Sequence, residues 1–404
     1  MSADRQADQS LFDNETAAQT DTRPPDPDHP DSRRDSAEGL SFPFSERPAP
    51  GTATEVGPGV VWIRMPLPWS LDHINLYAIS DGDGWALVDT GIDAQDIRGH
   101  WQTVFAGAFD GRPVTRMIVT HHHPDHIGLA GWVASLFDAP ILATRNAYLL
   151  ARVLMLDVAD TPPDEVLAFS RRAGFTWDQV DKLRARGWGN FARLVAPLPV
   201  GFRRIGGGDV LSIGGADWHV IETAGHAPGH ASLYDPAKKL LISGDQILPR
   251  ISSNVSVYPT EPDGNPLAEW LDGLARMRAL PDDTLVLPAH NTPFYGLRVR
   301  LDALIGKHVS RLGDVAALCD EPCAAVDIFP ALFRQRVTRD NIALATGEAI
   351  AHLHWLEAAG VVQRLPEDDG VARFRKVADY DMAGVTARLD MITQQARETA
   401  AWPT

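Results

Sequence analysis

The sequence predicts an α/β fold in which several strands end at residues that bind metal ions. Three short runs of aliphatic residues, at 114–119, 240–244 and 285–289, have the composition of buried strands. Histidine or aspartate follows each run within two residues. Because each candidate ligand lies just past an apolar strand, we expect one edge of a sheet to collect them all. Hydrophobic residues make up 44% of the 404-residue chain, which is enough for a sizeable core.

The densest group of candidate ligands is Thr-His-His-His-Pro-Asp-His-Ile-Gly at residues 120–128, between the first run and a predicted helix at 127–137. In locally extended chain, residues two apart point the same way, so His121 and His123 can bind one metal ion. Asp125 and His126 are adjacent on the following turn and can face a second ion. Neither site is complete without partners from elsewhere.

Three further segments supply those partners. His226 lies in a glycine-rich loop, residues 223–230, that follows the apolar run 218–221. Asp245 and His290 each end an aliphatic run. A complete ligand set in a fixed order is far more specific than a single His-x-His pair. The sequence therefore predicts a dinuclear metal site.

With these motifs in this order, the chain resembles the metallo-β-lactamase-fold hydrolases over about residues 60–294. The resemblance implies an αββα sandwich and assigns a role to each motif residue. In the first metal site the implied ligands are His121, His123 and His226. In the second they are Asp125, His126 and His290. Asp245 would bridge the two ions, and Asp89 would orient the metal loop from behind.

The ligand set suits two divalent metal ions. Imidazole and carboxylate without thiolate favour zinc, although iron or manganese would also fit. Two bridged ions polarise a carbonyl or phosphoryl oxygen and generate hydroxide at neutral pH. We therefore expect Asp245 and Asp125 to be catalytic, with Asp125 taking a proton as the tetrahedral intermediate collapses.

The leading hypothesis for the reaction is hydrolysis of a small ester, thioester or lactone. The metal site is similar to those of glyoxalase II and the acyl-homoserine lactonases. Antibiotic-hydrolysing relatives usually carry cysteine or serine where this chain has Asp245, which argues against a dedicated β-lactamase. The alternative hypothesis is a metal-dependent phosphodiesterase or endoribonuclease. A third class, a non-catalytic binding protein, requires that the protein binds no metal.

An insertion separates the two halves of the ligand set. His126 and His226 are 100 residues apart, and residues 145–200 have a mostly helical pattern. Helices are predicted at 146–158 and 163–173, and a third from an N-cap at Thr176 to residue 186. We interpret the insertion as a helical cap that supplies an apolar pocket, the alternative being an extra packing layer.

Several polar or aromatic residues are candidates for substrate contact or for support of the metal ligands. The loop 66–73 precedes a predicted strand and, by the resemblance, would overhang the metals. The segment after Asp245 is also polar. The candidates from these two segments and from the glycine-rich loop are Trp69, His73, His230, Arg250 and Asn254.

The ends of the chain differ from the catalytic domain, which we place at residues 56–298. Residues 1–45 hold ten acidic and four basic residues, a net charge of −6, and are predicted to be disordered. Residues 300–377 carry helices at 301–319 and 341–359, then a β-hairpin. This pattern is typical of a winged helix and resembles the tail of the β-lactamase-like protein 2 group. Residues 378–404 form a C-terminal helix or tail.

Charge and composition limit the partners. The formal charge of −16, and the net −1 of residues 300–377, argue against nucleic-acid binding, so we expect the C-terminal domain to serve packing or homodimer formation. Two cysteines give no disulfide framework, and no segment is long and apolar enough to span a membrane. A cytoplasmic enzyme with a small-molecule substrate is expected.

Overall fold

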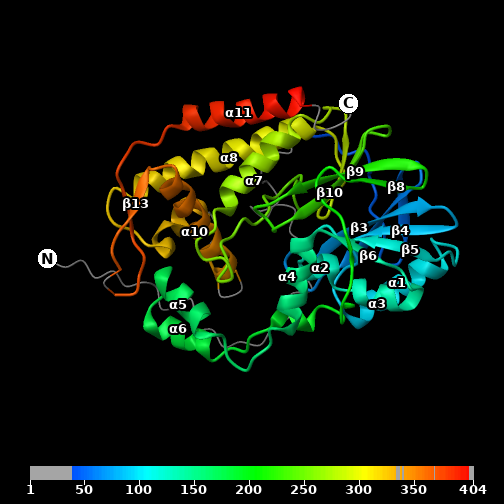
Figure 1. Ribbon diagram of the computed structural model, residues 1–404, viewed down its shortest axis with the longest axis horizontal. Coiled ribbons are helices and arrows are strands. Elements are labelled where there is room, and N and C mark those ends of the chain that lie inside the picture. The colour runs from blue at the N-terminus through cyan, green and yellow to red at the C-terminus, as the bar shows by residue number, and fades with distance from the viewer. Residues whose placement is uncertain (1–38, 334–336, 339–340, 368, 400–404) are drawn as a thin grey trace.

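The computed structural model of the chain describes residues 39–333, 337–338, 341–367 and 369–399. Two β-sheets pack face to face, and helices cover the outer face of each (Figure 1). This is the predicted αββα sandwich. Most of the predicted disordered tail lies outside the described residues.

The first sheet has seven strands in sequential order. Alternation along its strands divides their side chains between two cores: Trp62 faces the second sheet, whereas Ile63 faces the outer helices. The strands are β1 (Ala53–Gly57), β2 (Val60–Pro66), β3 (His73–Asp81), β4 (Gly84–Val88), β5 (Val114–Ile118), β6 (Ile141–Ala143) and β7 (Arg203–Arg204).

The second sheet has five strands in the order β12-β11-β10-β9-β8. Its inner face meets the first sheet through a core that includes Trp218 and Leu287, both fully buried. The strands are β8 (Val210–Ile213), β9 (Ala216–Thr223), β10 (His230–Asp235), β11 (Leu240–Gly244) and β12 (Leu285–Pro288).

Helices cover both outer faces. Against the first sheet pack α1 (Gln95–Ala106) and α3 (Ala130–Phe137), and the short α2 (Pro124–Ile127) lies just before α3. Against the second sheet pack α7 (Pro266–Met277) and α8 (Leu297–Leu318), which bury Trp270 completely. The predicted helix at 127–137 is thus broken at 128–129. At the break, the N–H of Leu129 donates to the carbonyl oxygen of Gly91 at 3.0 Å and to the hydroxyl of Thr90 at 3.1 Å, both outside the helix.

The insertion forms α4 (Arg145–Leu156), α5 (Asp164–Arg172), α6 (Trp177–Arg184) and the 3-10 turn η3 (Asn190–Arg193). Thr176 caps α6 as predicted, and Gln179 completes the capping box. α4 and η3 lie beside the sandwich, whereas α5 and α6 pack against the C-terminal region. The insertion therefore bridges the two parts of the protein (Figure 1).

The C-terminal region is mainly helical. After α8 come η4 (Ala325–Ile328), α9 (Phe329–Leu332), α10 (Ile342–Ala358), an antiparallel hairpin of β13 (Val362–Arg364) and β14 (Phe374–Lys376), and α11 (Met382–Glu398). The predicted helices and hairpin are present, although α8 begins before the predicted position 301. The winged-helix assignment stays a prediction. Among the described residues, no helix has the length and apolar character needed to cross a membrane.

Residues 39–45 belong to the predicted disordered tail and precede the predicted catalytic domain, but they pack on the sandwich. The backbone groups of Ser41 and Tyr295 form a bridge with N···O distances of 3.1 and 2.8 Å. Phe42 packs on Phe294 and Phe44 on Trp62, with ring centroids 6.4 and 6.2 Å apart. These aromatic contacts hold residues 39–45 on the sandwich, although the composition of residues 1–45 is typical of a disordered segment.

Candidate metal centre

The sheet topology brings the candidate ligands to one edge. β4 and β5 are parallel neighbours in the first sheet, and β11 and β12 are parallel neighbours in the second. Parallel neighbours end at the same edge of a sheet, so the residues that follow them converge. Asp89, the motif at 121–126, Asp245 and His290 follow these four strands, and His226 follows β9.

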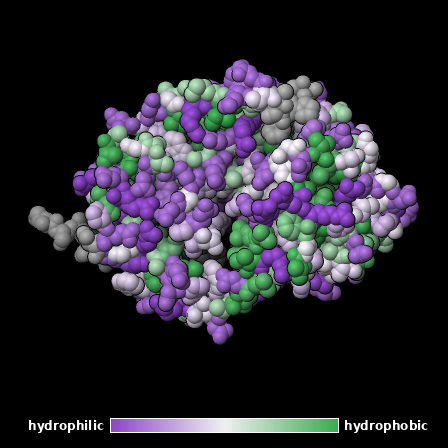
Figure 2. Space-filling view, viewed as in Figure 1, coloured by the Kyte–Doolittle hydropathy of each residue, from purple (hydrophilic) through white to green (hydrophobic). Residues whose placement is uncertain are grey.

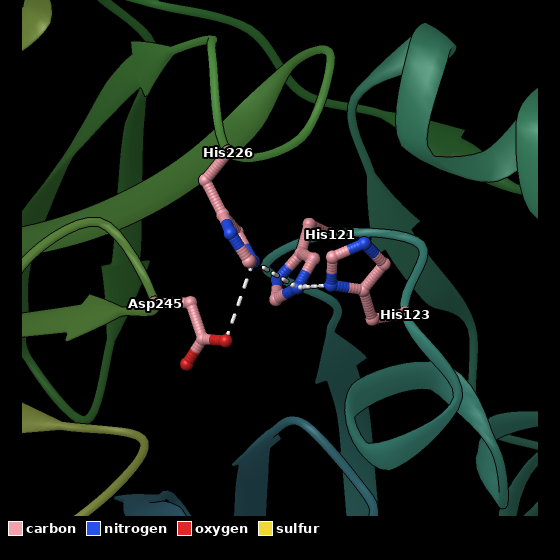
Figure 3. A group of neighbouring side chains, drawn as sticks. All are labelled: His121, His123, His226 and Asp245. Carbon is pink, nitrogen blue, oxygen red and sulfur yellow. Dashed lines mark hydrogen bonds and ion pairs between the residues drawn. The ribbon is translucent and has the colours of Figure 1, made fainter. Parts of the chain in front are cut away.

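The first group of ligands is His121, His123, His226 and Asp245, whose donor atoms all lie within 4.8 Å of one another. Figure 3 shows them pointing at a common centre. His121 Nε2 lies 2.9 Å from His123 Nδ1 and 3.3 Å from His226 Nε2. His226 Nε2 lies 3.3 Å from Asp245 Oδ2. Imidazole nitrogens gathered this closely suit a shared cation.

The second group is Asp125, His126 and His290. Asp125 Oδ2 lies 3.7 Å from His126 Nε2 and 3.5 Å from His290 Nε2. Asp245 stands between the groups: its Oδ2 faces His226, and its Oδ1 lies 3.3 Å from His290 Nε2. The carboxylate of Asp245 therefore faces both groups, and its role as a bridge between two ions stays a prediction.

Within the described part of the chain, two donor atoms of the site lack a hydrogen-bond partner, which is the state expected of metal ligands. His126 Nε2 and Asp245 Oδ1 are buried and make no hydrogen bond among the described residues. A buried polar atom without a partner costs free energy, which bonding to a metal would recover. The two orphaned atoms face the centres of the predicted sites, so the residues present fit a dinuclear centre.

The electrostatics of the centre also favour cations. Burial, together with neighbouring histidines, holds the pKa values of His121 and His123 well below their usual range, so both imidazoles are neutral donors. Burial opposes charge on His126 as well, but the carboxylates of Asp125, Asp89 and Asp245 outweigh it and raise its pKa. The negative potential of these carboxylates, which favours a proton on His126, also favours a metal cation there.

Asp89 and Thr120 support the metal loop from behind. His126 donates from Nδ1 to Asp89 Oδ2 over 2.7 Å, which leaves Nε2 free for a metal. Asp89 also accepts hydrogen bonds from the backbone N–H and the hydroxyl of Thr120, at 2.8 and 2.7 Å. Asp89 thus contacts the metal loop at His126 and Thr120, and its orienting role stays a prediction. Thr120 is a contact that the sequence alone did not identify.

Replacing Asp89 with asparagine should weaken metal binding at the second group by about 10- to 100-fold, because the amide does not hold the His126 tautomer as a carboxylate does. Competition with a chelator measures the affinity. Asp93→Asn is the matched control, since Asp93 lies on the same connection but pairs with Arg98 at 2.7 Å. Equal affinities for both variants would contradict this role of Asp89.

The residues proposed as substrate contacts turn out to lie mostly behind the ligands. The backbone oxygens of His73 and Asn254 accept hydrogen bonds from His290 Nδ1 at 2.8 Å and from His226 Nδ1 at 2.7 Å. The ring of His73 is engaged by Asp72 and by the N–H of Asn291, so it does not face a substrate. His230 is fully buried, and its Nε2 accepts the N–H of Asp245 at 3.1 Å.

Trp69 and Arg250 lie elsewhere on the surface. Trp69 is 44% exposed on the β2–β3 connection, and Arg250 stacks over Phe42 with its guanidinium carbon 4.8 Å from the ring centroid. Neither lines the cavity beside the metal centre. Contact of these two residues with a substrate stays a prediction. Loop polarity showed that the segments were accessible but not which way their side chains turn.

A cavity of about 460 Å³ opens beside the first group of ligands. The insertion forms one wall, and the segment 256–269, which runs into α7, forms the other. His122, His123 and His226 lie at its metal end. The side chains of the insertion that line it are Leu150, Leu154, Asp157, Pro163, Glu165, Val166, Trp188 and Phe191.

Fold and site together define a metallo-hydrolase with a candidate dinuclear centre. Residues 69–290 match the metallo-beta-lactamase superfamily, and residues 312–377 match the family described as metallo-beta-lactamase-like, C-terminal domain. The first match spans more than half of the chain, so the chain belongs to the metallo-beta-lactamase superfamily.

Known proteins resemble the chain over most of its length. A beta-lactamase domain protein from Burkholderia ambifaria is 40% identical, with a TM-score of 0.78 over 84% of this chain and 99% of that one. A metallo-beta-lactamase family protein from Thermus thermophilus is 27% identical, with a TM-score of 0.65 over 79% of this chain and 99% of that one. The probable metallo-hydrolase YqjP of Bacillus subtilis (strain 168) is 25% identical over 74% of this chain and 92% of its own length.

A more distant relative is a hydroxyacylglutathione hydrolase from Ruegeria pomeroyi, 29% identical over 38% of this chain and 66% of its own length. This similarity covers only part of the chain. The activity of that enzyme therefore does not by itself define the activity of this chain.

Proposed function

We propose that the protein hydrolyses a small carboxylic ester, thioester or lactone with the help of two zinc ions. The observation that carries the proposal is the cavity that runs from His123 and His226 along the apolar wall of the insertion. An acyl group placed in it would hold its carbonyl carbon at the ligand groups, which is what acyl transfer requires. The similarity to a hydroxyacylglutathione hydrolase also supports an acyl substrate.

The side chains of this protein divide the work. When bound, two divalent ions would polarise the scissile carbonyl and lower the pKa of water. Asp245, between the two histidine groups, fixes their separation. Asp125 lies at the second group and is partly exposed, so its carboxylate can accept a proton from the attacking water and return it to the leaving group. The buried surroundings exclude bulk water from the histidines.

A phosphodiester substrate fits the described residues less well. No lysine or arginine is among the residues that line the cavity within the described ranges, whereas Asp157, Glu165, Glu261 and Glu269 are. Sites for phosphodiesters commonly add cationic side chains to the metal ions that bind the phosphate. The acidic lining of this cavity therefore favours the acyl substrate over a phosphodiester.

Turnover by the zinc-loaded protein across a panel of acyl thioesters, esters and lactones tests the proposal, with bis(p-nitrophenyl) phosphate as the competing substrate. We expect hydrolysis of at least one acyl class and loss of that activity on addition of a chelator. Turnover of the phosphodiester alone would overturn the acyl-hydrolase proposal in favour of its rival.

A further inference from the structure

The insertion wall of the cavity is mainly apolar, whereas histidines line the metal end. The half-buried side chains of Leu150, Leu154 and Val166 give the insertion wall its apolar character, and Trp188 and Phe191 extend it. Figure 2 shows a hollow near the middle of this face, with hydrophobic residues over α4 beside it. A wall of this kind binds alkyl groups and gains free energy with each methylene that it removes from water.

The charged residues of the cavity all have one sign. Four carboxylates line it, and no cationic side chain does so within the described part of the chain. Partial burial and the nearby Glu261 raise the pKa of Glu269, which shows that these two carboxylates repel each other. An anionic substrate would add to this repulsion. The cavity therefore disfavours substrates that carry a carboxylate on the acyl chain.

His122 is a polar residue of the cavity lining near the metal end. His122 is 6% exposed and lines the cavity, and its Nδ1 makes no hydrogen bond within the described residues. Its ring centroid is 4.5 Å from that of His123, a candidate ligand. Alternation explains the position: His121 and His123 turn toward the metals, so the residue between them turns the other way, toward the cavity.

We propose that the cavity binds the acyl part of the substrate, that this part is apolar and uncharged at its far end, and that His122 forms a hydrogen bond with a polar substituent close to the scissile carbonyl. This inference rests on the proposed function and names its substrate class. A neutral 3-hydroxyacyl or 3-oxoacyl thioester or ester with an alkyl tail has the required chemistry.

Thioesters of the neutral thiol N-acetylcysteamine test the wall. With this leaving group held constant, kcat/KM should rise about fourfold for each methylene from acetyl toward octanoyl until the cavity is filled. The adipoyl thioester, which has the length of hexanoyl but ends in a carboxylate, should be at least roughly tenfold slower than hexanoyl. A flat chain-length series, or equal rates for adipoyl and hexanoyl, would overturn the inference.

Two tryptophans of the insertion make a matched pair for the same experiment. Trp188 lines the cavity, whereas Trp177 is 63% exposed and does not. Trp188→Ala should flatten the chain-length dependence and raise KM for hexanoyl more than KM for acetyl. Trp177→Ala should leave the whole series unchanged. Identical behaviour of the two variants would contradict the assignment of the wall.

The role of His122 is tested by a ratio. In the wild type, 3-hydroxyhexanoyl should be preferred to hexanoyl about tenfold, and in His122→Leu the ratio should fall to about one. Metal content, measured by elemental analysis, must stay at two per chain, because His122 lies between two ligands. An unchanged ratio in the metal-loaded variant would overturn the role of His122. Absence of any acyl turnover in the wild type would instead overturn the proposed function itself.

Discussion

Replacing Asp245 with alanine should lower kcat for acyl substrates by roughly 1,000-fold or more. The carboxylate of Asp245 contacts both ligand groups, and the stabilisation supplied by the metals would be worth several kcal/mol. The variant should also bind fewer than two metals per chain. Steady-state turnover and elemental analysis on the same preparation measure both effects.

The fold should survive this change, because Asp245 contributes no apolar packing to either core. Thermal unfolding of the metal-free proteins checks this point without the contribution of bound metal. Asp217→Ala is the control, since Asp217 is an exposed residue of β9 in the same sheet. An Asp245→Ala variant that is folded and retains more than about a tenth of the wild-type rate would contradict the assignment.

Replacing Gly225 with alanine should destabilise the protein by about 3 kcal/mol or more and displace His226. Gly225 has a φ of +100°, and a Cβ there would lie 2.5 Å from the carbonyl oxygen of Pro266 and 2.6 Å from the backbone nitrogen of Trp270. Those backbone atoms belong to the first turns of α7, where Trp270 is buried, so they cannot move without displacing the helix. The neighbouring ligand must shift instead.

The matched control is Gly215→Ala. Gly215 also has a positive φ, +77°, but a Cβ there meets no heavy atom within 4 Å. Its replacement should lower the free energy of unfolding by about 1 kcal/mol, the effect of a positive φ on an alanine without any steric overlap. Urea unfolding of both apoproteins compares the free energies of unfolding, and metal titration reports on His226. Equal destabilisation, with full metal binding in both variants, would contradict the packing argument at Gly225.

The ligand positions could be predicted because each depends on local pattern. A buried strand is visible as an aliphatic run, and the residue after it lies at a sheet edge whatever the rest of the chain does. The alternation that turns His121 and His123 the same way is likewise local. The same rule turns His122 away from the metals, so the signal for its place in the cavity was present in the sequence.

The surroundings of the site could not be predicted because they depend on distant partners. His73 is held by Asn291 and supports His290, a contact across more than two hundred residues. Arg250 turns toward Phe42, which belongs to a segment expected to be disordered. The packing of α5 and α6 against α10 is set by a small core that includes Phe175 and Ile342. Hydrophobic pattern shows that such residues are buried, but not against what.

The most direct test of the dinuclear acyl-hydrolase assignment is the rate of hexanoyl N-acetylcysteamine hydrolysis as zinc is titrated into the metal-free protein. The assignment predicts no activity without metal and a rise that reaches its plateau at about two zinc ions per chain. Activity that is already complete in the metal-free protein, or no hydrolysis with two zinc ions bound, would contradict it.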